Sequence, residues 1–95
     1  MGFRHILFNR VKSDAGFVVK IRTMSGFAEY REGDRIAIVP VQLVLGQALA
    51  HVNKDTRLKW KPPHDAEEIT EDKRKEILKN VVEAMRFRKY SVDLV

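Results

Sequence analysis

The chain has 95 residues, and 18 Lys and Arg against 13 Asp and Glu give it a formal net charge of +5. This length suits one small domain over residues 1–95 and excludes a second hydrophobic core. The absence of cysteine excludes a disulfide framework and a thiolate metal site. No apolar run approaches the roughly 18 residues of a membrane span, and the N-terminal run is too short for a signal peptide. We therefore expect a cytoplasmic protein without membrane contact.

The charges are distributed unevenly along the chain. Residues 1–63 carry a net charge of +6, residues 64–72 a net charge of −5 and residues 73–95 a net charge of +4. An acidic block in the middle of the chain is unusual for a protein whose whole surface binds nucleic acid. A protein that binds a protein partner through a mixed surface accommodates such a block readily.

The first half of the chain predicts strands. Residues 1–16 form either an edge strand or a loose N-terminal arm. Residues 17–22 alternate apolar and basic side chains, which is the pattern of a half-buried strand. Residues 27–30 and 35–41 predict two strands joined by a turn at Gly33, because glycine readily adopts the positive φ that a tight turn needs. The second of these strands is apolar on both faces, so we expect it at the centre of the sheet.

The middle of the chain has a less regular pattern. Residues 42–47 fit a strand end, a bulge or a single helical turn. Residues 48–52 and 56–60 are predicted to pair as a hairpin around a turn at 53–55. A double proline then ends the sheet, because neither proline can donate a backbone hydrogen bond. Trp60, just before it, either closes one end of the core, as we favour, or serves as an exposed interface anchor.

The C-terminal part predicts one helix over about residues 70–88. Thr70 is a suitable N-cap, because its hydroxyl can accept a hydrogen bond from an amide of the first turn. The following apolar residues recur at helical spacing and define one buried face, formed by Ile77, Leu78, Val81, Val82 and Met85. Residues 90–94 alternate and predict a short final strand. The predicted fold class is α+β: an antiparallel sheet of five to six strands with one main C-terminal helix packed on it and a short final strand.

Nothing in the sequence points to catalysis or to a metal ion. The three histidines, His5, His51 and His64, lack the spacing of a zinc site, and His51 fits a partly exposed strand position. The acidic run after His64 fits a solvated loop better than an acid–base pair, which would need a cleft that shifts pKa values. We expect no enzymatic activity and no cofactor.

Basic residues alternate along two of the predicted strands, with Lys20 and Arg22 on one and Arg57, Lys59 and Lys61 on the other. Together they could line an exposed sheet face that binds nucleic acid, with Phe27 or Tyr30 stacking on the bases. A solvated sheet face whose lysines protect an edge explains the same pattern, and we favour it.

Four short motifs occur along the second part of the chain: Gly26-Phe27 with Tyr30 to Arg35, then Trp60-Lys61-Pro62-Pro63, then Glu68-Ile69-Thr70, and then Arg74, Ile77 and Asn80 on one helix. Together they resemble the Immunity protein 74 family of bacterial polymorphic toxin systems, over roughly residues 22–94. Gln42 stands where this resemblance leads us to expect an acidic residue.

The resemblance implies an immunity protein that binds the C-terminal domain of one cognate toxin and neutralises it by stoichiometric occlusion. It supplies no catalytic residues. A basic chain suits a basic nuclease toxin poorly, so either the toxin is not a basic nuclease or the acidic block, formed by Asp65, Glu67, Glu68, Glu71 and Asp72, is the contact surface. The predicted toxin-binding residues are Asp65, Glu67, Glu68, Glu71, Arg57, Lys59 and Lys61. The alternative function is a small basic nucleic-acid-binding module that uses an exposed sheet face.

Overall fold

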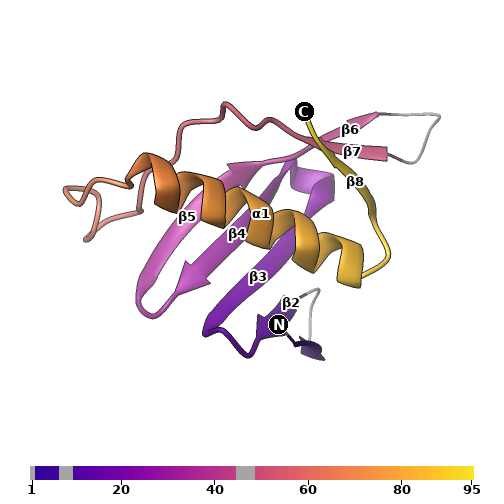
Figure 1. Ribbon diagram of the computed structural model, residues 1–95, viewed down its shortest axis with the longest axis horizontal. Helices are drawn as coiled ribbons and strands as arrows, with labels where there is room; N and C mark the ends of the chain where they lie inside the picture. The colour runs from indigo at the N-terminus through magenta and orange to yellow at the C-terminus, as the bar shows by residue number, and fades with distance from the viewer. Residues whose placement is uncertain (1, 7–9, 45–48) are drawn as a thin grey trace.

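The computed structural model describes residues 2–6, 10–44 and 49–95, which form two β-sheets and one α-helix (Figure 1). The first sheet is antiparallel and contains, in spatial order, β1 (Phe3–Ile6), β2 (Arg10–Ser13), β3 (Phe17–Arg22), β4 (Phe27–Glu32) and β5 (Arg35–Pro40). The second contains β6 (Gln42–Val44), β7 (Leu49–Val52) and β8 (Ser91–Leu94). Helix α1 (Glu71–Phe87) covers one face of the first sheet, and a short 3-10 helix (Thr23–Ser25) links β3 to β4.

The strands predicted in the first half of the chain are confirmed as β3, β4 and β5. Gly33, with a φ of 63°, lies in the tight turn between β4 and β5. Residues 1–16, for which we expected an edge strand or a loose arm, contain two strands in their described part: β1 at the edge of the sheet, and β2 between β1 and β3. The Phe3 ring of β1 lies 5.6 Å from the ring of Phe87, so this edge of the sheet reaches the C-terminal end of α1.

The prediction that β5 lies at the centre of the sheet is wrong, because β5 forms the second edge. An irregular segment covers its outer side: Trp60 forms a bridge with Ala37, and the backbone N–H of Lys61 donates to the carbonyl of Ile36 at 2.7 Å. This segment, instead of another strand, shields the apolar residues of β5. Trp60 itself is only 5% exposed and belongs to the core, which confirms the interpretation that we favoured for it.

The second sheet contradicts the predicted hairpin. β7 confirms the strand expected at 48–52, with Ala48 outside the described residues, but its partners are β6 on one side and β8 on the other. Residues 56–59 run without a ladder, although their side chains alternate between half-buried and exposed as a strand would. Both edges of β7 are already paired, so this segment has no free strand beside it there. The ambiguous residues 42–47 include strand β6, while 45–47 lie outside the described residues.

Helix α1 confirms the predicted helix and its buried face. The hydroxyl of Thr70 accepts a hydrogen bond from the backbone N–H of Lys73 at 3.2 Å, as expected of the N-cap. The five residues of the predicted apolar face are all buried. Lys89, with a φ of 68°, lies in the turn after the helix, and β8 follows as the predicted final strand, parallel to β7.

A polar network joins α1 to the first sheet. The Tyr30 hydroxyl donates to Oε1 of Glu32 at 2.7 Å, Lys73 donates to the same oxygen at 2.8 Å, and buried Asn80 lies 3.5 Å from the Tyr30 hydroxyl. Burial, and then the bond to Glu32, raise the pKa of Tyr30, so its hydroxyl remains a donor. Burial favours a higher pKa for Glu32, but the bonds from Lys73 and Tyr30 outweigh it and lower that pKa.

The structure confirms the α+β class, the main C-terminal helix and the short final strand. The strands expected in one sheet are divided between two, and eight are present in the described part of the chain. No helix among the described residues is both long enough and apolar enough to span a membrane.

Candidate functional site

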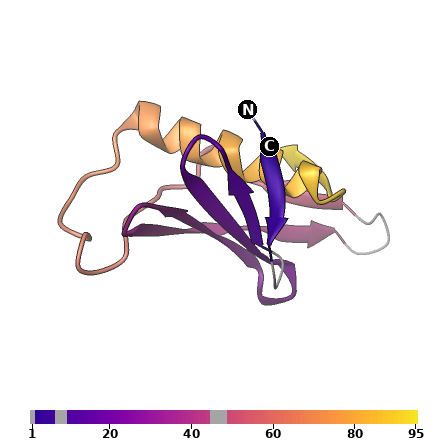
Figure 2. The ribbon, with the colours of Figure 1, turned by 90° about the horizontal axis from the view of Figure 1, so that it is seen from below.

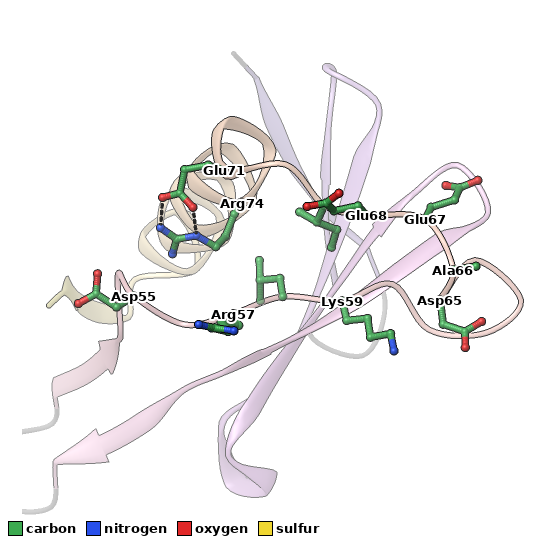
Figure 3. A pocket seen from close by; sticks show the side chains of 11 residues that line it. Asp55, Arg57, Lys59, Asp65, Ala66, Glu67, Glu68, Glu71 and Arg74 are labelled. Carbon is green, nitrogen blue, oxygen red and sulfur yellow. Dashed lines mark hydrogen bonds and ion pairs between the residues drawn. The ribbon is translucent and has the colours of Figure 1, made fainter.

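An open groove of about 650 Å³ lies beside the N-terminal end of α1 (Figure 3). Three parts of the chain line it: the irregular segment after β7, the loop before α1 and the first turns of α1. The lining residues are Asp55, Arg57, Leu58, Lys59, Asp65, Ala66, Glu67, Glu68, Ile69, Glu71 and Arg74.

The groove brings together six of the seven residues that the sequence suggested for toxin binding, namely Arg57, Lys59, Asp65, Glu67, Glu68 and Glu71. The seventh, Lys61, is exposed but is not among the lining residues. The sequence analysis did not assign Asp55 and Arg74 to the site. Arg74 carried a local signal, since it lies three residues after Glu71 on the same helix and can pair with it.

Hydrogen bonds from Arg74 connect one wall of the groove to α1. Its guanidinium donates to both carboxylate oxygens of Glu71, at 3.0 and 2.5 Å, and also to the carbonyl oxygens of Lys54 and Thr56. Its side chain is only 14% exposed. The hydrogen bond from Arg74 lowers the pKa of Glu71, which favours the charged carboxylate. One side chain therefore holds the segment after β7 against the first turns of the helix.

Hydrogen bonds from Arg35 connect the opposite wall to the first sheet. Its guanidinium donates to both carboxylate oxygens of Glu67, at 2.5 and 2.8 Å, and this bond lowers the pKa of Glu67. His64 lies in the same cluster, with its ring nitrogens 3.2 Å from a carboxylate oxygen of Asp34 and 3.7 Å from one of Glu67. The loop before α1 is thus attached to the start of β5 and to the turn that precedes it.

Four of the charged side chains that were predicted for toxin binding and line the groove remain available to a partner. Asp65, Glu68, Arg57 and Lys59 make no side-chain hydrogen bond or ion pair with any residue that the structure describes, and all four are exposed. Arg57 and Lys59 come from the segment after β7, whereas Asp65 and Glu68 come from the loop before α1 (Figure 3). The groove therefore presents two cations, Arg57 and Lys59, and three exposed carboxylates, Asp55, Asp65 and Glu68, and its lining also includes half-buried Leu58 and Ile69.

The predicted basic stripe across one sheet face is wrong in its composition. Lys20 and Arg22 belong to β3, but Arg57, Lys59 and Lys61 lie on the irregular segment and on neither sheet. Tyr30 cannot stack on a base, because it is fully buried. In the described residues, no group of three or more His, Asp or Glu side chains is placed to hold a metal ion.

The family model for Immunity protein 74 matches residues 28–95, which include β4 from its second residue, β5, the whole groove, α1 and β8. Comparisons with curated proteins and with solved structures gave no match. The matched region agrees with the resemblance expected over residues 22–94 and makes up most of the chain. The chain belongs to the Immunity protein 74 family.

Proposed function

We propose that this protein is an immunity protein that binds the C-terminal domain of one cognate toxin in the cytoplasm and neutralises it by stoichiometric occlusion. The observation that supports the proposal is membership of the Immunity protein 74 family over residues 28–95. Occlusion requires a complementary surface and no reacting group. The groove beside α1 offers such a surface, because its free charges lie on backbone segments that are already fixed.

The two arginine anchors give the groove a defined shape before a partner arrives. Arg35 holds the loop before α1, and Arg74 holds the segment after β7. Binding to a preformed site costs less free energy because fewer loops have to become ordered, and this favours tight binding. The opposed charges then select the cognate toxin: a matching segment places a cation near Asp65 and Glu68 and a carboxylate near Arg57 and Lys59.

A titration of the purified toxin domain with the protein near physiological salt tests the function. We expect a one-to-one complex with an affinity in the nanomolar range, and loss of the toxin's activity at equimolar protein. If no complex forms at micromolar concentrations, the proposed function is wrong, whatever surface is considered.

Charge reversal tests the groove separately. The double variant Asp65→Lys/Glu68→Lys changes only carboxylates without an internal partner, so it should leave the fold intact and weaken toxin binding at least tenfold, or about 1.4 kcal/mol. We avoid Glu67, because its reversal would also release the loop from Arg35.

The matched control is Glu83→Lys/Asp93→Lys, which makes the same change in charge outside the groove lining. It should retain wild-type affinity for the toxin within about twofold, as surface substitutions away from an interface usually do. If both variants bind the toxin equally well, the contact surface lies elsewhere, although the protein remains an immunity protein.

A further inference from the structure

The face of the first sheet that points away from α1 is strongly basic, and we call it the open face. In Figure 2, α1 lies on one side of the first sheet, and no strand or α-helix of the described residues covers the other side. Strand alternation puts the buried residues of β2, β3 and β4 on the helix side and the intervening charged residues on the open face. These charged residues are Arg10, Lys12, Lys20, Arg22, Arg31 and Glu29, so the described side chains include five cations and one carboxylate.

The structure shows no side-chain partner for these cations among the described residues. None of the five makes a hydrogen bond or ion pair with any residue that the structure describes. The register places Arg10 directly opposite Lys20 on the neighbouring strand. Like charges in directly opposed positions destabilise a sheet, whereas Glu29, directly opposite Lys20 on its other side, offsets part of this charge. The arrangement concentrates positive charge where a polyanion can bind.

Three of the cations surround a small hollow. Arg10, Lys20 and Arg31 line it together with Val18 and Glu29, and its volume is about 110 Å³. A single small anion such as a phosphate group fits a space of this size. Arginine and lysine are the side chains that proteins use for phosphate, arginine through its planar fork and lysine as a point charge.

We propose that the open face binds the phosphate backbone of double-stranded nucleic acid without sequence preference. This proposal goes beyond the immunity function and does not depend on it, because the open face and the groove share no residue. On a strand, alternate side chains recur about 6.7 Å apart and neighbouring strands lie about 4.8 Å apart, so the cations form a flat array and not a point site.

The composition of the face favours a nucleic acid over an acidic protein. The large apolar side chains that are exposed in the described chain are Leu43, Leu94 and Val95, and none lies on this face. The apolar side chains that strand alternation places on this face, Val18, Phe27, Ile36 and Ile38, are all half-buried, so charged side chains make up most of its exposed part. Phe27 is the one aromatic side chain of β3 and β4 on this face and is half-buried, so stacking on unpaired bases is weak and the duplex backbone is the better ligand.

Fluorescence anisotropy with a labelled DNA duplex of about 20 base pairs tests the proposal. Because each neutralised phosphate releases counterions, we expect the affinity to fall roughly a hundredfold between about 50 and about 200 mM salt. The variant Lys12→Gln/Lys20→Gln should weaken binding at least tenfold at the lower salt and reduce the salt slope by about two. The variant Lys12→Arg/Lys20→Arg should retain binding, because it keeps both charges.

The matched control is Lys75→Gln/Lys79→Gln, which removes two lysines from the exposed side of α1 and should bind the duplex like the wild type. If Lys12→Gln/Lys20→Gln does not fold, Arg22→Gln/Arg31→Gln tests the same face. Three results would overturn the proposal: no binding of the duplex at the lower salt, equal losses in the face and control variants, or equal competition by an acidic polypeptide. The last result would assign the face to an acidic protein partner.

Discussion

The groove and the open face both carry charges without internal partners, but their side chains are positioned in different ways. In the groove, Arg35 and Arg74 bind carboxylates and carbonyls of the two flanking segments, so the free charges are attached to fixed backbone. On the open face, strand register alone sets the spacing of the cations. The groove is therefore suited to one partner of matching shape, and the open face to a repeating polyanion. Binding at the groove should depend on geometry, and binding at the open face on salt.

The largest effect that we expect comes from Trp60→Ala. Trp60 lies on the segment that runs past the groove, and its side chain is buried against the core. Loss of a buried Trp side chain costs about 3–5 kcal/mol, a large part of the total stability of a domain of this size. Urea unfolding measures this loss. The neighbouring variant Lys61→Ala, which changes an exposed side chain, should stay within about 0.5 kcal/mol of wild type. A loss below about 1 kcal/mol for Trp60→Ala would contradict its place in the core.

A smaller and more selective effect is expected for Arg74→Gln. The substitution releases the carbonyls of Lys54 and Thr56 and removes the partner of Glu71, so one wall of the groove loses its attachment to α1. Toxin affinity should fall about five- to tenfold, because the partner must then order that wall, while duplex binding at the open face stays unchanged. Calorimetry and anisotropy measure the two affinities.

Arg74→Lys should restore only part of the toxin affinity, because an ammonium group cannot reproduce the planar guanidinium fork. Lys75→Gln, one residue further along α1, is the control for the loss of a positive charge. Equal toxin affinity for the wild type and Arg74→Gln would mean that the groove keeps its shape without this anchor.

The smallest effect that we expect is a pH dependence of stability, which comes from the groove and not from the open face. Bonds from Arg35 and Arg74 lower the pKa of Glu67 and Glu71 below the ordinary value of 4.5. As the pH falls, Glu67 and Glu71 therefore bind protons at a higher pH in the unfolded chain than in the folded protein. The stability that these pairs contribute is fully present above about pH 4.5 and is lost as the pH falls through their lower, folded-state pKa values. The open face contains neither Glu67 nor Glu71, so the loss of these two pairs should not by itself weaken duplex binding.

Urea unfolding between neutral pH and about pH 3 measures this dependence. Glu67→Gln/Glu71→Gln should show a flatter profile than the wild type. Glu32 contributes a dependence of the same sign and remains in that variant, so some acid sensitivity persists. An unchanged profile would show that the two arginine pairs do not contribute to stability.

Local signals in the sequence predicted the helix, its cap and the hairpin turn correctly. Thr70, the periodic apolar residues of α1 and Gly33 act within a few residues of their own position, so their patterns are readable without knowledge of the fold. The pairing of β7 is local on one side only. Residues 56–60 alternate as a strand would, but β6, just before β7 in the sequence, occupies one edge of β7, and β8, near the other end of the chain, occupies the second.

The candidate site also combines features that are readable locally in the sequence with features that depend on long-range contacts. The charges of the acidic loop and of Arg57 and Lys59 are visible in the sequence. Their shared groove depends on contacts over longer distances, between Arg35 and Glu67 and between Arg74 and the carbonyls after β7. Residues that carried the family resemblance have structural roles here: Trp60 packs in the core, and Asn80 contributes to the network between α1 and the sheet. The resemblance thus identified the scaffold, and the free charges around it are what can set partner choice.

The parallel pairing of β7 with β8 has a consequence for how the protein forms. Parallel strands cannot be joined by a tight turn, and here residues 53–90, which include every residue of the groove, lie between the two strands. This pair must close a long loop before its hydrogen bonds form, whereas the hairpins of the open face close short ones. We expect the open face to form early in folding and the groove to be completed only after β8 has been synthesised and docked. The proposed toxin-binding groove would then be among the last parts of the new chain to form.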